Sequence, residues 1–405
     1  MLIGFRFVQD KGKVASVNKK AMNVLILGGR APAALELGRI FTKSKNKVWF
    51  AESFPFALSK YSNTCAQFLP LPEPNRHPKA FIDEILVICN RFNIDLVIPT
   101  CEEVFYLSYY KDKFPKKTLV FVDEFTKLKS LHDKFEFIKM VEAAQLLAPK
   151  TQKVDNPEEL GKLWKKRNRC VIKPVFSRFG EHVLINPLSE SDLPSAVTAK
   201  NPYVFQEYIS GKLYCSYSVC QDGILLAHTC YSSEFYAGRA AIHFEHITHT
   251  GICEWVSKFV AFHRITGQVS FDFIENENGL YPLECNPRAT SGIHNFFQDT
   301  RLASCFDQLE PRQLVEPQGR GQHAIMLALI LYGFPKVRSW GMLLKLLKTI
   351  WKSRDVIFDL KDPLPALGQF VSYGSFLRKA LQSGITSLDA TVEDIAFSGE
   401  NIFRE

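Results

Sequence analysis

Phe271-Asp272-Phe273 and, beyond a turn at Asn276–Gly279, Tyr281-Pro282-Leu283-Glu284-Cys285-Asn286-Pro287-Arg288 form the stretch that decides the fold of this chain. The pattern predicts a β-hairpin with Asp272 on the incoming strand and with Glu284 and Asn286 on the outgoing strand. Residues two apart on a strand point to the same face, so Glu284 and Asn286 would share one. Carboxylate and amide oxygens are hard ligands that suit Mg²⁺ or Mn²⁺ held together with nucleotide phosphates. Arg288 would follow on that face, where a cation can hold a transferring phosphoryl group.

A solvated hairpin with scattered acids is the structural alternative, because short motifs often occur without a site. A second segment upstream favours a site. The apolar run Cys170–Val175 places Lys173 at the end of a short strand, and Ser177 and Arg178 follow in a tight loop before another strand at 183–185. A lysine between apolar neighbours can point into a cleft and bind phosphate, although it can also extend to solvent from the surface.

A third segment begins a predicted helix. Asp133 is a candidate N-cap, and Lys134 falls in the first turn. A positive charge is unfavourable at this end of the helix dipole. The misfit indicates that the charge of Lys134 serves another purpose.

A fourth segment, Tyr203–Gly211, is an apolar strand that runs into a short connector. Backbone groups in such a connector can read the edge of adenine, with Glu207 accepting from the exocyclic amine. An edge strand with one exposed glutamate would give the same sequence.

The order and spacing of these segments resemble the ATP-grasp superfamily, and most of all the branch that contains biotin carboxylase and the large subunit of carbamoyl-phosphate synthetase. The resemblance covers residues from about 22 to 300. The segment Phe244–Ile247 also looks like a Glu-His-Ile segment of the synthetase that lies beside the nucleotide. The resemblance implies that ATP and Mg²⁺ (or Mn²⁺) bind this chain. The implied nucleotide-binding residues are Lys134, Lys173, Ser177, Arg178, Gln206, Glu207, Tyr208, Ile209, Tyr214 and His246. The implied metal ligands are Asp272, Glu284 and Asn286, and the implied catalytic residues are Lys173 and Arg288.

The chain departs from the family pattern at three places. Tyr214 stands where relatives often carry an acid that binds ribose, and the phosphate-covering loop has Gly180 as its only glycine, with Ser177 and Arg178 in place of small residues. Ser270 stands where some relatives have a catalytic arginine. The reaction is therefore not transferable from any one relative.

The segment before residue 123 predicts an alternation of strands and helices. Strands are expected at Asn23–Gly28, Val48–Glu52 and Leu96–Thr100, and helices at Pro32–Lys43 and Phe81–Phe92. This alternation is typical of a parallel, Rossmann-like sheet. Glu102 and Glu103 follow a strand end, so they would face the cleft for the second substrate, or else lie exposed at a helix start.

The predicted fold class is α/β (α+β ATP-grasp), with a Rossmann-like parallel sheet before a two-subdomain ATP-grasp fold. The expected divisions are an N-terminal tail at 1–21, the Rossmann-like domain at 22–122, the ATP-grasp domain at 123–304 and a C-terminal extension at 305–405.

Composition bounds the other function classes. The chain has 405 residues, 46% of them hydrophobic and 13% aromatic, which is typical of a folded protein with a large core. Lys plus Arg number 50 against 42 Asp plus Glu, a mild excess that fits anionic substrates without indicating nucleic-acid binding. The ten cysteines are dispersed without a Cys-x-x-Cys pair, which indicates reduced thiols and a cytoplasmic chain. No apolar run is long enough to span a membrane, so stable insertion is not expected.

Two further segments each have a structural and a functional interpretation. His243, His246 and His249 could gather on one helix face, but their apolar neighbours favour an extended segment and no zinc site. Trp340–Trp351 predicts a basic amphipathic helix, which could lie on a membrane but more often packs on its own domain.

The expected function is an ATP-dependent carboxylate–amine ligase that forms an acylphosphate and releases ADP and phosphate. The expected partners are a small-molecule carboxylate, an amine and a second copy of the chain in a homodimer. One alternative is a carboxyphosphate or carbamoyl-phosphate type of enzyme that uses bicarbonate. The other is an ATP-binding sensor without catalysis.

Overall fold

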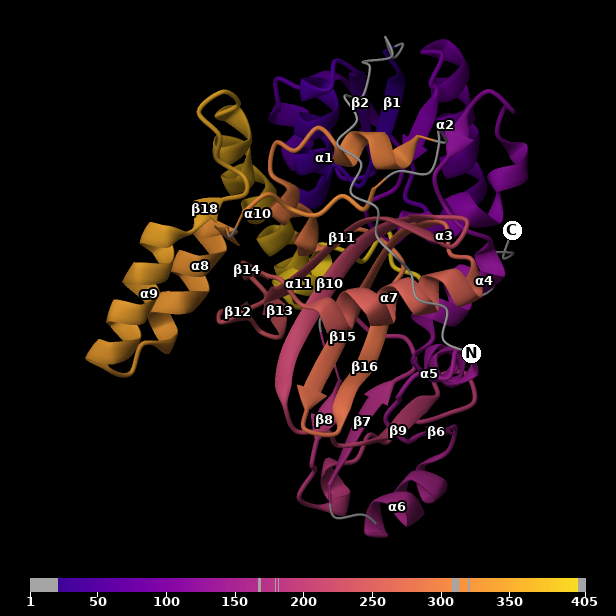
Figure 1. Ribbon diagram of the computed structural model, residues 1–405, viewed down its shortest axis with the longest axis vertical. Coiled ribbons are helices and arrows are strands. Elements are labelled where there is room, and N and C mark those ends of the chain that lie inside the picture. The colour runs from indigo at the N-terminus through magenta and orange to yellow at the C-terminus, as the bar shows by residue number, and fades with distance from the viewer. Residues whose placement is uncertain are drawn as a thin grey trace.

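The structure is a computed structural model that describes residues 21–166, 169–178, 180, 182–307, 313–319 and 321–399. The predicted N-terminal tail, apart from Ala21, lies outside this part of the chain. Figure 1 shows two β-sheet regions above and below a large central sheet, with a helical arm that projects to one side.

The N-terminal sheet is parallel throughout, as predicted, with strand order β3-β2-β1-β4-β5. Alternate residues of β1 enter two different hydrophobic clusters: Val24 and Ile26 pack in one, and Leu25 and Leu27 in the other. Both faces are therefore buried, which explains the continuous apolar strands. The elements are β1 (Asn23–Leu27), α1 (Pro32–Lys43), β2 (Lys47–Glu52), η1 (Leu58–Tyr61), β3 (Cys65–Pro70), α2 (Pro78–Arg91), β4 (Leu96–Ile98), α3 (Glu103–Tyr109), η2 (Lys111–Lys113) and β5 (Leu119–Val120).

A small four-stranded sheet, antiparallel in every pair, forms the opposite end of the molecule with order β6-β9-β7-β8. Helix α6 covers one face, where Leu160 packs with Ile172 and Phe205. The elements that lead to and form this region are α4 (Phe125–His132), α5 (Lys134–Ala143), β6 (Thr151–Val154), α6 (Pro157–Lys165), β7 (Cys170–Pro174), β8 (Leu184–Ile185), η3 (Glu190–Asp192) and β9 (Tyr203–Glu207).

The central sheet has the order β16-β15-β10-β11-β14-β17-β18. Helix α7 packs on one face, where Trp255 contacts Phe271 and Phe273. On the other face Gly292 of η4 lies against Tyr217 and Tyr231. The elements are β10 (Lys212–Gln221), β11 (Ile224–Ser232), β12 (Tyr236–Ala237), β13 (Ala240–Ala241), β14 (His243–Ile247), α7 (Thr250–His263), β15 (Gly267–Asn276), β16 (Gly279–Asn286), η4 (Ser291–Phe296), η5 (Leu302–Phe306), β17 (Gln322–Ala324) and β18 (Arg354–Asp355).

The C-terminal part leaves the central sheet, forms the projecting arm and returns. The arm consists of α8 (Met326–Gly333), η6 (Phe334–Lys336) and α9 (Trp340–Lys352), and α10 (Leu364–Ser383) and α11 (Ser387–Ala390) follow. The division at 304/305 stays a proposal, since η5 runs across it and β17 and β18 extend the central sheet beyond it.

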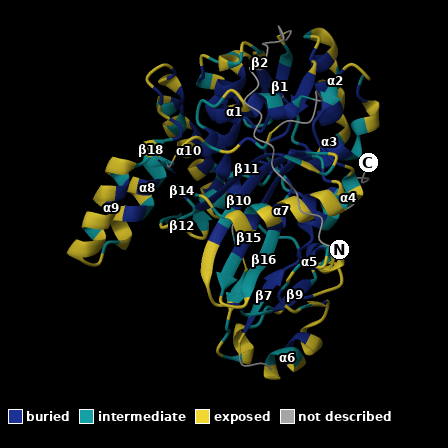
Figure 2. Cartoon of the chain, in the orientation of Figure 1, coloured by how far each residue is buried: buried dark blue, intermediate teal, exposed yellow. Residues whose placement is uncertain are grey.

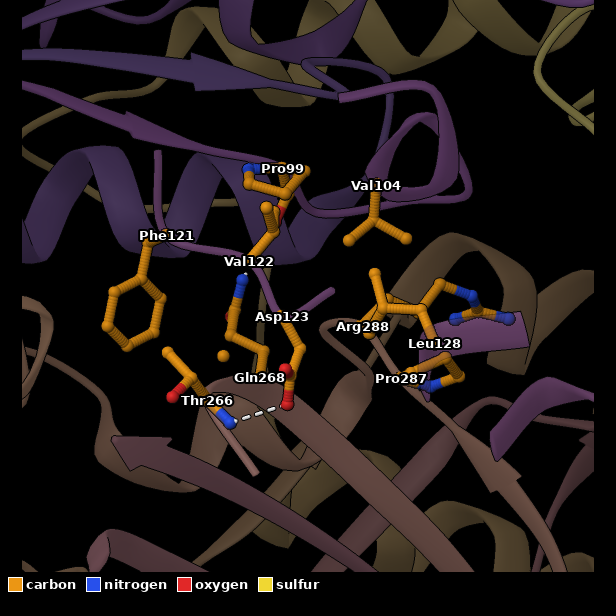
Figure 3. Close-up of a pocket in the computed structure, with 11 residues that line it drawn as sticks. Pro99, Val104, Phe121, Val122, Asp123, Leu128, Thr266, Gln268, Pro287 and Arg288 are labelled. Atoms are coloured by element: carbon orange, nitrogen blue, oxygen red, sulfur yellow. Dashed lines mark hydrogen bonds between the residues drawn. The ribbon is translucent and has the colours of Figure 1, made fainter. Parts of the chain in front are cut away.

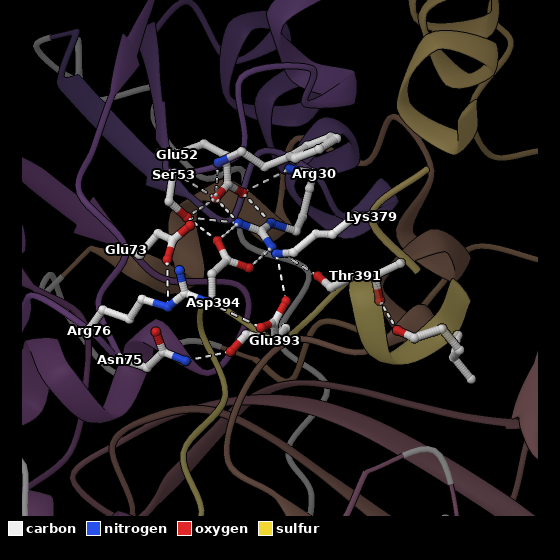
Figure 4. Close-up of polar contacts among 12 residues, drawn as sticks. Arg30, Glu52, Ser53, Glu73, Asn75, Arg76, Lys379, Thr391, Glu393 and Asp394 are labelled. Atoms are coloured by element: carbon white, nitrogen blue, oxygen red, sulfur yellow. Dashed lines mark hydrogen bonds and ion pairs between the residues drawn. The ribbon is translucent and has the colours of Figure 1, made fainter. Parts of the chain in front are cut away.

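The returning chain is held against the N-terminal sheet by buried charges (Figure 4). The Arg30 guanidinium, at the end of β1, donates to both carboxylate oxygens of Asp394 at 2.6 Å and pairs with Glu52 at 2.6 Å. Arg30 also donates to the carbonyl of Thr391. The carboxyl edge of the parallel sheet is therefore covered by residues from the other end of the chain.

The histidine segment, the cysteines and the helices agree with the sequence-based predictions. The segment with three histidines is extended, as expected, with His243 and His246 in β14. All ten cysteines are free thiols. Within the described ranges, no helix has both the length and the apolar character needed to cross a membrane.

Candidate active site

The hairpin of β15 and β16 brings two carboxylates together. Asp272 lies directly opposite Glu284 in the antiparallel register, so both side chains point to one face. A bulge follows, because Phe273 pairs with Pro282 and leaves Leu283 as the extra residue. Pro282 has no N–H to donate, which suits a bulge on the edge strand β16.

The bulge has a direct consequence for the site. The Leu283 carbonyl accepts a hydrogen bond of 3.0 Å from Lys173 Nζ. Lys134 Nζ lies 3.6 Å from Glu284 Oε2 and donates to the carbonyl of Ser177 at 3.2 Å. Both lysine side chains are buried. Two lysines from α5 and β7 thus converge on the carboxylate hairpin, although Lys173 and its partner Leu283 are 110 residues apart in the sequence.

Local sequence explains how each lysine reaches this place. Asp133 caps α5, and its side chain accepts from the backbone N–H groups of Phe135 and Glu136, which fixes Lys134 in the first turn. The Lys134 backbone also donates to the carbonyl of Val175 just beyond β7, which joins the two lysine-bearing segments. Lys173 alternates with residues that pack on α6, so it points to the opposite face of the small sheet.

The charges of the cluster act on one another. Burial raises the pKa of Asp272 to about 7, and the nearby Glu284 charge adds to this rise. Burial would also raise the pKa of Glu284, but Lys134 and Lys173 outweigh it and lower that pKa. Burial lowers the pKa of Lys173 to about 8, against the attraction of Glu284. The cluster therefore holds more positive charge than one carboxylate can compensate.

Asn286 is the last residue of β16, and Arg288 lies two residues beyond the strand rather than on a continuation of it. Arg288 Nη2 donates to Asn286 Oδ1 at 3.2 Å, and Nη1 donates to the carbonyl of Ala289 at 3.1 Å. Arg288 also borders a cavity of about 10 Å³ between the hairpin and the N-terminal sheet (Figure 3), where Asp123 Oδ2 accepts from the backbone N–H of Thr266. That volume is on the order of one water molecule, so the cavity is a packed junction rather than space for a nucleotide.

The strand β9 and its connector present the predicted base-binding residues. Gln206 lies opposite Val171, so it shares with Lys173 the face turned away from α6. Its side chain is buried and donates to Thr151 Oγ1 at 2.9 Å. Glu207 lies opposite Cys170 and so alternates to the other face, where its carboxylate accepts from the Lys150 backbone.

The two residues after Glu207 are held differently. The Tyr208 ring lies 4.1 Å from the Arg169 guanidinium, and Ile209 is buried.

Ser177 and Arg178, in the predicted phosphate-covering loop, bind other parts of the chain. Arg178 Nε donates to Glu102 Oε2 at 2.6 Å, and Nη2 donates to the carbonyl of Phe397 at 2.5 Å. Burial would raise the pKa of Glu102, but Arg178 and His132 outweigh it and lower the pKa to about 2. Ser177 contributes its carbonyl to Lys134. Arg178 thus links the loop to the N-terminal sheet and to the C-terminal segment.

Glu103 differs from its neighbour Glu102, although the sequence placed both at the cleft. Its carboxylate turns back and accepts from the backbone N–H groups of Thr100 and Cys101. Burial raises the pKa of Glu103 to about 7. Glu103 therefore closes the loop after β4, whereas Glu102 binds Arg178 and the Phe397 backbone.

Two predicted nucleotide-binding residues lie away from the Asp272–Glu284 pair. Tyr214 lies on the α7 face of the central sheet, opposite Phe273, and packs edge-on against His249. His246 shares the face of Asp272 but stands three strands away, at about 14 Å for strands 4.7–4.9 Å apart, and its Nδ1 contacts Thr229 Oγ1.

Sequence reasoning missed His132 and the C-terminal segment. His132 is buried next to the lysine cluster, and burial lowers its pKa to about 3. Its Nε2 has no hydrogen-bond partner among the described residues. The Phe397 ring stacks on Phe105 with 4.5 Å between ring centroids, and the Phe397 backbone N–H donates to Glu102. The only sequence signal for His132 was its position next to Asp133-Lys134. No local pattern predicted that Phe397 lies here.

The donor set fits a divalent cation bound together with phosphate. Two carboxylates and an amide oxygen share the hairpin, and burial together with the nearby Glu284 charge raises the pKa of Asp272, which a cation bound between the two carboxylates would offset. The described ranges contain no group of three or more His, Cys, Asp or Glu side chains that could hold a metal by themselves. Phosphate oxygens would have to complete the coordination.

Comparison with known proteins agrees with this geometry. Residues 131–292 match the family model described as the ATP-grasp domain. An uncharacterized protein of Methanocaldococcus jannaschii is 24% identical over 162 residues, which is 40% of this chain and 42% of that protein. The match thus spans less than half of the curated relative.

Solved structures with different activities share the fold. N5-carboxyaminoimidazole synthetase from Staphylococcus aureus, complexed with ADP, has a TM-score of 0.59 at 16% identity and covers 76% of this chain and 83% of its own. L-amino acid ligase from Bacillus licheniformis has a TM-score of 0.55 at 16% identity, over 72% and 76%. Biotin carboxylase from Campylobacter jejuni has a TM-score of 0.59 at 14% identity, over 75% of each chain. The predicted ATP-grasp fold is confirmed: residues 131–292 match the ATP-grasp domain, and the solved structures share the fold over about three quarters of the chain.

Proposed function

We propose that this chain, which carries an ATP-grasp domain, is an ADP-forming ligase that joins a small-molecule carboxylate to an amine. In the first step a carboxylate oxygen of the substrate attacks the γ-phosphorus of ATP, the bond from that phosphorus to the β,γ-bridging oxygen breaks, and ADP leaves. In the second step the amine nitrogen attacks the acyl carbon, the bond from that carbon to the phosphate oxygen breaks, and phosphate leaves. The amine loses its proton to solvent or to a base.

The observation that carries the proposal is the convergence of Lys134 and Lys173 on the Asp272–Glu284 pair. Two buried ammonium groups face one carboxylate of low pKa and a second of raised pKa. This excess of buried positive charge is unfavourable unless an anion binds, because buried charge needs a partner of opposite sign. Polyphosphate is the anion that this arrangement fits.

Each residue then has a role in the proposal. Lys134 and Lys173 hold the β- and γ-phosphates and offset the charge that develops on them. Asp272, Glu284 and Asn286 would hold Mg²⁺, or Mn²⁺, which supplies Lewis-acid polarisation of the phosphoryl oxygens when bound. Arg288 lies next to Asn286 and would contact the transferring phosphoryl group or the substrate carboxylate.

Gln206 is the better candidate for contact with adenine than Glu207. It shares the face of Lys173, and its carboxamide can both donate and accept at the base edge. Glu207 alternates to the α6 side. The backbone of Tyr208 and Ile209 would complete the base site.

ADP and phosphate release from Mg²⁺-ATP tests the proposal, with pooled amino acids and small carboxylates and with hydroxylamine as the trap. We expect turnover that needs one pool and yields a hydroxamate. ATP binding without turnover in any pool would contradict the ligase proposal and favour the ATP-binding sensor.

Bicarbonate is a second candidate for the carboxylate. It is favoured by the fold shared with proteins named as N5-carboxyaminoimidazole synthetase and biotin carboxylase. ADP release that depends on bicarbonate alone, without hydroxamate from any organic acid, would support this form of the reaction.

A further inference from the structure

The projecting arm has an inner face that is packed. Leu346 and Thr349 of α9 are buried, and Leu346 belongs to a cluster with Leu329 of α8. A Cβ on Gly333 would lie 2.9 Å from Leu346 Cδ1, so the absence of a side chain there permits the close approach of the two helices. These buried contacts hold α8 and α9 together as one unit.

The outer face of α9 is apolar and exposed. Trp340, Leu344, Leu347 and Trp351 have exposed fractions of 79%, 63%, 45% and 89%. Their spacing of 4, 3 and 4 residues puts them on one stripe of the helix. Phe334, in the turn before α9, is also exposed. Figure 2 shows the helix at the edge of the molecule with its outer surface exposed. A single exposed leucine is ordinary, but a continuous stripe with two tryptophans marks an interaction surface.

Basic residues line this stripe. Lys348 and Lys352 are exposed. Because successive helical residues are rotated by 100°, both lie on the face next to the apolar stripe, and Lys345 lies beside them. Helix α9 contains no acidic residue. Lys345 pairs with Glu234 at 3.0 Å, so Lys348 and Lys352 carry the charge that is best placed to meet a partner.

We propose that the outer face of α9 docks on a membrane surface that bears anionic lipids. A helix with Trp and Leu on one face and Lys on the next lies in the plane of the interface, with the apolar face among the acyl chains and the lysines at the head groups. With 13 residues, α9 is about 20 Å long and too short to cross a hydrocarbon core of about 30 Å. Docking is therefore peripheral.

The charge pattern favours lipid over protein as the occupant. Helix α9 carries lysines and no acidic residue. Its arm projects away from the central sheet, where a flat surface can reach it (Figure 1). A protein partner would more often meet a groove or a surface with mixed charge. The apolar stripe supplies the affinity, and the lysines select anionic lipid.

The intact chain offers a direct readout, since Trp340 and Trp351 are strongly exposed while Trp49 and Trp255 are buried. We expect tryptophan emission to shift to shorter wavelength, and the protein to float with vesicles of phosphatidylcholine and phosphatidylglycerol at 3:1, but not with phosphatidylcholine alone. Lys348→Gln with Lys352→Gln should weaken binding roughly 30-fold, from about fivefold for each lysine near the surface. Trp340→Ala with Trp351→Ala should abolish flotation.

Leu188→Ala is the matched control, because Leu188 is a strongly exposed apolar residue outside the arm; it should bind vesicles as the parent does. No flotation of the parent protein with anionic vesicles at low salt would overturn the proposal. Equal binding to neutral vesicles would overturn it as well. A dimer in light scattering that the two tryptophan substitutions dissociate, without vesicle binding, would assign the face to a second copy of the chain. ATP turnover is measured separately, so its loss or absence does not bear on these results.

Discussion

Lys173→Met should make the protein more stable at neutral pH while it removes ATP turnover. Lys173 is 5% exposed, and its pKa falls from 10.5 in the unfolded chain to about 8 in the folded one, chiefly because of burial. The shift of 2.5 units (10.5 − 8) corresponds to about 3 kcal/mol at 1.36 kcal/mol per unit, which is what keeping this lysine charged in the fold costs at pH 7. Methionine has a similar length and no charge.

Two losses offset part of that gain. The hydrogen bond from Lys173 Nζ to the Leu283 carbonyl disappears, at about 1 kcal/mol, and Glu284 keeps only Lys134 as its near cation. We therefore expect a net stabilisation of about 2 kcal/mol at pH 7. ATP turnover should fall roughly 10²–10³-fold, the usual effect of removing a charge that stabilises the transition state.

The depressed pKa of Lys173 determines whether stability rises or falls with pH. Between pH 8 and 10.5 the unfolded chain keeps a proton on Lys173 that the folded chain has released, so the stability of the parent rises with pH in this window. At pH 9.5, which is 1.5 units above the folded pKa of Lys173, the free energy of unfolding of the parent has risen by about 2 kcal/mol. The difference in stability between the parent and Lys173→Met should therefore vanish at this pH. Other groups titrate alike in both proteins and cancel in the difference.

Urea denaturation at pH 7 and pH 9.5 measures these values, with Lys139→Met as the control. Lys139 is exposed on the same helix as Lys134. Its surface contacts are an ion pair with Glu136 and the Phe135 ring at 4.3 Å, so its replacement should change stability by less than about 0.5 kcal/mol at either pH. A Lys173→Met protein that is less stable than the parent at pH 7, by the same amount at both pH values, would mean that Lys173 is a structural ion-pair partner. The charge-excess reasoning would then be refuted.

Three further outcomes follow from the same contacts. Glu284→Gln should lower the rate of ADP release roughly 10²–10³-fold with an unchanged circular-dichroism spectrum. The control Glu275→Gln, on the same hairpin, should keep a rate within about twofold of the parent, and an equal loss of rate in both variants would contradict the metal assignment. Because the pKa of Asp272 is raised to about 7, ATP turnover should rise from pH 6 to pH 8 with a midpoint near 7 that more Mg²⁺ moves downward, and a flat profile would contradict this. Arg30→Met should lower the free energy of unfolding by about 3–5 kcal/mol, since it leaves two buried carboxylates unpaired, whereas Arg76→Met at the surface should change it by less than about 0.5 kcal/mol; similar values for both would show that the network of Figure 4 is not coupled to folding.

Local pattern predicted those parts of the fold that depend on nearest neighbours. The hairpin, the cap at Asp133 and the parallel N-terminal sheet follow from alternation, turn residues and capping chemistry, and the structure contains each of them. The face on which a side chain lies depends on register, and there the sequence was less informative: Tyr214 alternates to the α7 side of its strand, away from Asp272. A one-residue error in a strand moves a side chain to the other face.

Long-range closure could not be predicted in this way. Residues 391–397 lie on the carboxyl edge of the first sheet because Arg30 and Glu102 bind them, across more than 290 residues of sequence. Neither residue has a local partner that would reveal this. Glu102 was expected at the cleft, but its bonds to Arg178 and Phe397 depend on three segments meeting at once.

These contacts connect the two ends of the chain to the chemistry of the middle. Arg178 belongs to the loop whose Ser177 carbonyl holds Lys134, and the same guanidinium binds Glu102 and the carbonyl of Phe397. A charge-assisted contact to a buried carboxylate is strong, so the loop, the first sheet and the C-terminal segment restrain one another. Since Lys134 also contacts Glu284, the position of this lysine depends on closure of the chain at its far end. The C-terminal segment is thus part of the structural support of the candidate active site, because the buried Arg30 and the half-buried Arg178 both bind it.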